Sequence, residues 1–114
     1  MGAIYCITST VTGKHYVGKT TQKYPAKRWT SHKHRARKGE QTHFYNAIRK
    51  YGEESWTFKV LVHNVPEQLL STLEVEFIRT YNSLQDGYNS TVGGEGTTGY
   101  KLSEAHIAKL KEVS

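Results

Sequence analysis

Two short segments near the N-terminus are rich in β-branched and aromatic residues. They span residues 3–9 and 15–20, and the turn residues Thr12-Gly13-Lys14 lie between them. Two such segments joined by a short turn that contains glycine are typical of a β-hairpin. The hydrophobic pattern therefore predicts that the chain opens with two antiparallel strands.

Helical periodicity follows in three places. Pro25 suits the first turn of a helix, so we expect a basic helix from there to about residue 38, ended by Gly39. A second helix, from about residue 42 to 51, has one apolar face made of Phe44, Ala47, Ile48 and Tyr51. A third helix, from residue 66 to about 82, has a wider apolar face made of Leu69, Leu70, Leu73, Phe77, Ile78 and Tyr81.

A third strand is expected between the second and third helices. There Trp56, Phe58, Val60 and Val62 alternate with Thr57, Lys59, Leu61 and His63, which predicts one buried face. The order strand, strand, helix, helix, strand, helix predicts a small α/β or α+β domain with helices packed around the sheet.

Length and composition limit the class of protein. A chain of 114 residues favours one domain. The single cysteine, Cys6, excludes an internal disulfide and is typical of a reducing compartment. No apolar run approaches the ~18 residues of a membrane-spanning helix, and no signal-peptide pattern is present at the N-terminus. We therefore expect a chain that is neither secreted nor membrane-bound, located in the cytoplasm.

The distribution of charge indicates a polyanionic partner. Residues 14–50 hold eleven basic residues and one acidic residue, a net charge of +10, whereas the rest of the chain carries −4. A block of one sign favours nucleic acid first and an anionic membrane surface second. The alternative is a solvated basic face without a partner.

Two matches to phosphate-binding motifs lack the required context. Residues 13–20 fit GxxxxGK(S/T), but their middle is expected to be a strand, and the next helix signal, Pro25, comes five residues later. Residues 94–99 fit GxGxxG without a strand before them. His32, His34 and His43 lack the spacing of a zinc site. We therefore expect no nucleotide cofactor and no structural zinc.

A carboxylate falls on the apolar face of the third helix. Helical periodicity places Glu74 inside that face and Glu76 toward its solvated side. An ionised carboxylate on a packing face costs several kcal/mol unless it is paired or binds a cation. Glu74 is therefore either an edge glutamate paired with an arginine or the ligand of a hard metal ion.

Cations and phenols complete the candidate site. Arg28, His32 and Arg35 form one stripe on the first helix, which either faces solvent or faces a phosphodiester. Tyr5 and Tyr16 lie on the hairpin strands, where packing and catalysis are both open. The two phenols share a sheet face only if paired residue numbers across the hairpin sum to an odd number.

These residues carry a resemblance to a known family. Ala3-Ile4-Tyr5 and Tyr16-Val17-Gly18 resemble the paired signature of the GIY-YIG nuclease superfamily, and the resemblance extends over roughly residues 2–96. Its further landmarks follow in the same order: Lys27-Arg28-Trp29 with His32, the run from His43 to Gly52, Leu73 to Ile78, and Gly87-Tyr88-Asn89. Ala3 stands in place of the signature glycine, which requires a negative φ there, and Val17 stands in place of isoleucine.

The resemblance implies a fold, an activity and a set of residues. The fold is a small three-stranded antiparallel sheet flanked by helices, and the activity is metal-dependent hydrolysis of DNA phosphodiesters. By position, the resemblance implies that the catalytic residues are Tyr5, Tyr16, Arg28, His32, Glu74 and Asn89. Glu74 would hold the metal, Mg²⁺ or Mn²⁺, and Tyr5 rather than Tyr16 would orient or deprotonate the attacking water, with Lys19 or His32 lowering its pKa. Residues expected to contact DNA are Lys19, Lys33, Arg35, Arg37, Lys38 and His43.

The resemblance also implies an organisation. The run from Gly87 to Gly96 is most similar to phage and intron homing endonucleases, which tether a nuclease domain to a separate DNA-binding region. We expect a nuclease domain over residues 1–96 and a linker or tail helix over residues 97–114, of phage-encoded intracellular origin. One metal site per domain implies a homodimer on DNA or sequential nicking. The alternative function is a nucleic-acid-binding module without catalysis.

Overall fold

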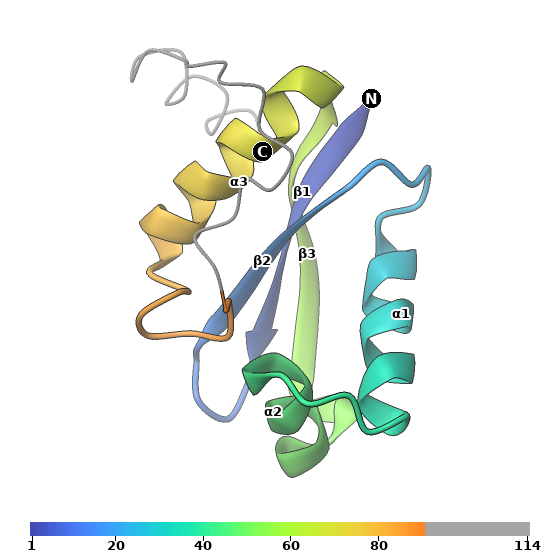
Figure 1. The fold of residues 1–114 in the computed structure, drawn as a ribbon, viewed down its shortest axis with the longest axis vertical. Helices are drawn as coiled ribbons and strands as arrows, with labels where there is room; N and C mark the ends of the chain where they lie inside the picture. The colour runs from blue at the N-terminus through green and yellow to red at the C-terminus, as the bar shows by residue number, and fades with distance from the viewer. Residues whose placement is uncertain (91–114) are drawn as a thin grey trace.

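The elements of the structure follow the predicted order (Figure 1). The structure, a computed structural model, describes residues 1–90. One antiparallel sheet has the strand order β2-β1-β3, with β1 (Gly2–Ser9), β2 (His15–Thr20) and β3 (Trp56–Val65). The helices are α1 (Ala26–Arg37), α2 (His43–Tyr51) and α3 (Glu67–Tyr81), with a 3-10 turn η1 (Glu53–Ser55) before β3. The predicted α+β class is confirmed, whereas the expected tail over residues 97–114 lies outside the described residues.

Helices cover both faces of the sheet. Helix α3 lies against one face, and α1 and α2 lie on the other (Figure 1). Because side chains alternate along a strand, β1 supplies both cores: Ile4 and Cys6 pack under α3, and Tyr5 and Ile7 pack under α1 and α2. The α3 core is aliphatic, whereas the second core is largely aromatic.

The hairpin register places the two strand tyrosines together. Tyr5 pairs with Gly18, and Tyr16 pairs with Ile7. Every pair in this ladder has residue numbers that sum to an odd number, which is the condition for Tyr5 and Tyr16 to share a face. Both phenols therefore lie on the face covered by α1 and α2.

Strand β3 contains an irregularity that the sequence pattern did not predict. Ile4 pairs with Val62 and Tyr5 pairs with Val60, which leaves Leu61 as an extra residue. Such a bulge bends the strand and changes its side-chain alternation. The alternation that placed Leu61 with the polar set is wrong, because Leu61 is buried beside Val62 in the α3 core.

The backbone at Ala3 and the length of the helices also agree with what the sequence predicts. Among the described non-glycine residues, only Asn64 and Asn82 have positive φ, so Ala3 meets the condition set for replacing a signature glycine. No helix in the described part of the chain combines the length and apolar character required to cross a bilayer.

Candidate active site

The side chain of Tyr5 crosses the edge strand of the sheet. Tyr5 is fully buried on the central strand β1, and its ring passes over Gly18 of β2. A Cβ at residue 18 would lie 2.4 Å from both Cζ and Oη of Tyr5. Gly18 is therefore required where it stands, because only glycine leaves room for the phenol to reach the β2 edge. This role of Gly18 was not predicted from the sequence, although a glycine inside a strand is a known signal of close approach.

A buried hydrogen-bonded chain links Tyr5 to both helices on its face of the sheet. The Tyr5 hydroxyl lies 2.9 Å from His32 Nε2 on α1, and His32 Nδ1 lies 3.0 Å from the Tyr45 hydroxyl on α2. His32 is 2% exposed. Burial, with a smaller contribution from Arg28 and Arg35, lowers the pKa of His32 to about 3, so the imidazole is neutral. The sequence did not predict Tyr45 as a residue of this site. The only sequence feature that could have indicated it is a tyrosine in the helix that became α2, where it is buried.

Arg28 brings a permanent positive charge to Tyr5. Burial raises the pKa of Tyr5, and the adjacent guanidinium of Arg28 acts in the opposite direction. Arg28 Nε is buried and has no hydrogen-bond partner among the described residues. Buried donors are rarely left unpaired, so this N–H is suited to an anionic oxygen supplied by a ligand.

Tyr16 is held by aromatic contacts. Its ring stacks on Phe44 with centroids 4.1 Å apart and meets the His32 ring edge-on at 5.1 Å. Burial raises the pKa of Tyr16 strongly, and the neighbouring Tyr5 adds to the shift. Tyr16 is therefore a neutral phenol that can hydrogen-bond but is a poor base.

Glu74 lies at the same edge of the sheet, on α3. Its side chain is nearly buried and forms an ion pair of 3.8 Å with Lys19, whose Nζ also donates to Ser71 Oγ at 2.7 Å. The charge of Glu74 contributes to the raised pKa of both Tyr5 and Tyr16, which places the carboxylate within electrostatic reach of the two phenols. The inward position predicted for Glu74 is confirmed, and the ion pair that it forms with Lys19 is with a lysine, whereas an arginine was expected.

The donor set fits a water-rich hard ion better than an enclosed metal site. Within residues 1–90, no three His, Cys, Asp or Glu side chains gather into a metal-binding group. Glu74 offers one carboxylate, and Mg²⁺ is typically held by one or two carboxylates together with substrate phosphates and water. The residues present therefore fit a magnesium-type ion shared with a phosphate.

A pocket of about 450 Å³ adjoins these groups. It lies between the end of β2, the following loop, α1 and the first turns of α3. Its lining residues are Lys19, Thr20, Thr21, Gln22, Arg28, Glu67, Leu70 and Ser71. Lys19 and Arg28 give it two cationic groups, which suits an anionic ligand.

Asn89 and His43 lie beside the site rather than inside the Tyr5–His32 chain. The Asn89 amide accepts from Val17 N and donates to Val17 O, both at 2.8 Å, and so pairs the outer edge of β2 as a neighbouring strand would. This contact positions the segment that carries Tyr16 and Gly18. His43 is exposed at the start of α2, with its ring 5.1 Å from that of Tyr88.

The basic residues of α1 differ in what they contact. Arg37 donates two hydrogen bonds to Glu53, at 2.6 and 2.5 Å. Arg35 lies 3.9 Å from Glu40, and Lys33 Nζ lies over the Trp29 ring at 5.3 Å. Lys38 is exposed at the end of the helix. Arg37 is therefore paired with the carboxylate of Glu53, whereas Lys19, on β2, lines the pocket.

Comparisons with known proteins agree with this geometry. The family model described as the GIY-YIG catalytic domain matches residues 1–89. The structure is similar to the catalytic domain of intron endonuclease I-TevI, solved as a glutamate-to-alanine mutant, with 26% identity, a TM-score of 0.70 and coverage of 82% of this chain and 97% of that one.

A second solved structure, the catalytic domain of homing endonuclease I-TevI, has 26% identity, a TM-score of 0.68 and coverage of 80% and 99%. No curated protein sequence gives a match. Because the family match spans most of the chain and the fold agrees over the same region, this chain belongs to the GIY-YIG family of nucleases.

Proposed function

We propose that the chain is a metal-dependent endonuclease that hydrolyses phosphodiester bonds in DNA, as the catalytic domain of a phage or intron homing endonuclease. The observation that carries the proposal is the meeting of Tyr5, Arg28, His32 and Glu74 at the β2 edge, beside a basic pocket. Both similar solved structures are described as catalytic domains of an intron or homing endonuclease, which supports the same assignment.

Tyr5 is the residue that orients the attacking water. In its phenolate form, after its own proton has passed to solvent, it accepts the proton of that water. Its oxygen lies beside His32 Nε2 and the Arg28 guanidinium. A phenol in a buried site is a weak base at neutral pH, and the nearby cation favours its ionised form. Tyr16, a neutral phenol, hydrogen-bonds to the water or the phosphate.

Arg28 stabilises the negative charge that develops on the phosphate. Its guanidinium is permanently charged and planar, and its buried Nε has no partner in the described part of the chain. A preorganised donor aimed at developing charge typically contributes about 10²–10³-fold to kcat. Lys19, in the same pocket, adds a second cation toward the DNA backbone.

Glu74 is the residue that would hold the divalent ion, Mg²⁺ or Mn²⁺. When bound, such an ion polarises a phosphate oxygen as a Lewis acid. The chain itself contributes the nearly buried carboxylate, which forms an ion pair of 3.8 Å with Lys19. Glu67 also lines the pocket, but Glu74 is the nearly buried carboxylate whose charge reaches Tyr5 and Tyr16, so its loss is expected to remove the metal ligand.

We expect DNA to lie next to the pocket, across the surface that carries the basic residues named in the next sentence. Lys19, Lys33, Arg35, Lys38 and His43 are proposed to contact the phosphate backbone, which positions the duplex without reading its sequence. Arg37 contributes less because Glu53 already occupies its guanidinium. Cleavage of both strands then requires a homodimer on DNA or two sequential nicks.

The experiment compares cleavage of supercoiled plasmid with Mg²⁺, with Mn²⁺ and with excess EDTA. We expect nicking or linearisation with either ion and none with EDTA. Glu74→Ala and Arg28→Ala should each lower cleavage by about 10²-fold or more while DNA binding persists. Glu76→Ala is the matched control, because Glu76 lies two residues away on α3 and pairs with Arg79 instead.

The competing function is a nucleic-acid-binding module. It predicts DNA binding by the wild-type chain with no cleavage in either ion. Equal cleavage by the wild type and Glu74→Ala would contradict the assigned role of the carboxylate, even if the chain cuts DNA.

A further inference from the structure

We propose that Tyr24, with Lys23 and Lys27 beside its ring, binds one unpaired nucleotide of the DNA next to the cleaved phosphodiester. The ring stacks on the base, and the two ammonium groups contact the phosphates on either side of it. These three residues are called the Tyr24 platform below. The proposal rests on the proposed function for its ligand, DNA, and adds that a base is exposed beside the site of cleavage.

The first observation is the exposure of the Tyr24 ring. Within residues 1–90, Tyr24 is the only phenylalanine, tyrosine or tryptophan that is largely exposed, at 58%. A single exposed apolar side chain is common on protein surfaces, so exposure alone does not indicate a ligand. The groups around the ring decide what it can bind.

The second observation is a pair of cations beside this ring. Lys23 Nζ and Lys27 Nζ lie 5.6 and 5.7 Å from the centroid of the Tyr24 ring. The ion pairs of the described chain involve other cations, so no carboxylate neutralises these two. Cation–π contacts at exposed sites are weak, so both lysines can exchange the ring for phosphate oxygens. A ring face flanked by two cations matches a nucleotide, in which a planar base is attached to a backbone with a phosphate on each side.

The third observation is the place of the Tyr24 platform beside the pocket. Gln22 and Arg28 both line the pocket, and Tyr24 lies between them in the chain. The Cα atoms of Gln22 and Tyr24 are no more than about 8 Å apart, because only two peptide units separate them. Lys27 N donates to Tyr24 O at 3.0 Å, which folds the loop onto the first turn of α1. The ring therefore lies near the rim of the pocket that is proposed to receive the cleaved phosphate.

The charge of this segment favours a nucleic-acid strand. Residues 19–28 hold four basic residues and no acidic residue. Glu67, which lines the pocket from α3, lies 4.0 Å from the N-terminal ammonium group. Cations in a row attract the phosphates of DNA and also those of an anionic membrane. A lipid headgroup has no planar base to cover the Tyr24 ring, so the exposed ring favours DNA.

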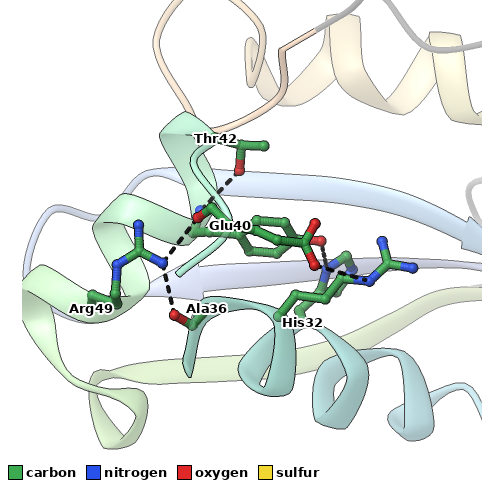
Figure 2. Close-up of polar contacts among 7 residues, drawn as sticks. His32, Ala36, Glu40, Thr42 and Arg49 are labelled. Atoms are coloured by element: carbon green, nitrogen blue, oxygen red, sulfur yellow. Dashed lines mark hydrogen bonds and ion pairs between the residues drawn. The ribbon is translucent and has the colours of Figure 1, made fainter. Parts of the chain in front are cut away.

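The Tyr24 platform is attached to a helix that is fixed in the domain. Pro25 follows Tyr24, and a residue before proline is restricted in its backbone conformation. At the other end of α1, Arg49 of α2 donates to Ala36 O and Glu40 O at 2.7 and 2.9 Å (Figure 2). A tyrosine on a restricted backbone loses little conformational freedom when it binds, which favours its use as a contact residue.

The test is DNA binding by the whole chain in excess EDTA, measured by fluorescence anisotropy. The probes are a labelled single-stranded oligonucleotide and its fully paired duplex. Tyr24→Ala should weaken binding to the single strand by about fivefold or more, the lower end of what one stack of an aromatic ring on a base contributes. Its loss on the duplex should be smaller, because paired bases are already stacked on one another. Tyr24→Phe keeps the ring and should bind like the wild type.

The salt dependence separates the ring from the lysines. Lys23→Ala and Lys27→Ala should each lower the slope of log K against log salt concentration by about 0.7 on the single strand. Tyr24→Ala removes no charge and should leave this slope unchanged. Val11→Ala is the matched control, because Val11 is 60% exposed but lies before β2, at the end of that strand remote from Tyr24. Val11→Ala should keep the affinity for both DNA probes.

Four results would overturn the proposal. Single-strand affinity that is unchanged in Tyr24→Ala, or reduced as much in Tyr24→Phe, contradicts stacking on the ring. An equal loss on the duplex contradicts an unpaired nucleotide. If Tyr24→Ala loses binding to phosphatidylserine vesicles but not to DNA, the Tyr24 platform is a membrane contact. A wild-type chain that binds neither DNA probe refutes both the Tyr24 platform and the proposed function, whereas a chain that cleaves plasmid while Tyr24→Ala binds normally refutes the Tyr24 platform alone.

Discussion

A methyl group at residue 18 would collide with the phenol of Tyr5, which makes Gly18→Ala a direct test of the site geometry. The new Cβ would lie 2.4 Å from Tyr5 Cζ and Oη, about 1 Å short of ordinary contact. The backbone at residue 18 does not have positive φ, so alanine adds no conformational strain. Tyr5 itself is fully buried and stacks on Phe58 at 5.5 Å, which leaves little space for its ring to retreat.

The expected loss follows from this overlap. Overpacking of a close-packed core costs about 1–3 kcal/mol in the free energy of unfolding. A displacement of about 1 Å at a reacting group can cost about 10²-fold in rate. Gly18→Ala should therefore lower both stability, measured by urea unfolding, and plasmid cleavage.

A double-mutant cycle separates the clash from other effects. Tyr5→Leu removes the ring atoms that the methyl would meet, so Gly18→Ala in that background should cost much less in unfolding free energy. An equal cost in both backgrounds would refute the idea that Gly18 is needed for the passage of Tyr5. Unchanged cleavage by Gly18→Ala would refute the tight placement of the phenol.

Three further outcomes are expected. Folding keeps His32 neutral at a pKa of about 3, so the unfolded chain binds more protons than the folded chain between pH 3 and about 6.5, and the free energy of unfolding rises with pH there by up to about 1.4 kcal/mol per pH unit. His32→Gln should flatten this slope in unfolding measurements across pH. An unchanged slope would contradict a neutral imidazole. Asn89→Ala should lower the free energy of unfolding by about 1–3 kcal/mol, because it leaves the Val17 backbone groups without their two bonds, and a thermal or urea melt equal to wild type would disprove that role. In DNA-binding titrations across salt concentration, Lys33→Ala should reduce the slope of log K against log salt concentration by about one unit. Arg37→Ala should change this slope less, because Arg37 is already paired with Glu53. The reverse order would show that the Arg37–Glu53 ion pair opens on DNA.

The local pattern of the sequence determined the elements of this fold. Helix and strand periodicities depend on neighbours within a few residues, so the hairpin, the three helices and the inward position of Glu74 could be predicted from residue order. The short sequence motifs that resemble the GIY-YIG signature also predicted the family, and the family model confirms it. Site roles that depend on chemistry, such as the metal ligand, stay predictions to be measured.

Only the tertiary structure decided which remote groups meet. The hairpin register, the bulge at Leu61, the passage of Tyr5 over Gly18 and the hydrogen bond between His32 and Tyr45 each join residues on different elements. A one-residue change in pairing would move every side chain of a strand to the other face, and the local pattern does not set that pairing. The same reason applies to Arg37, which belongs to the basic block of residues 14–50 in sequence but lies against Glu53 once the helices pack.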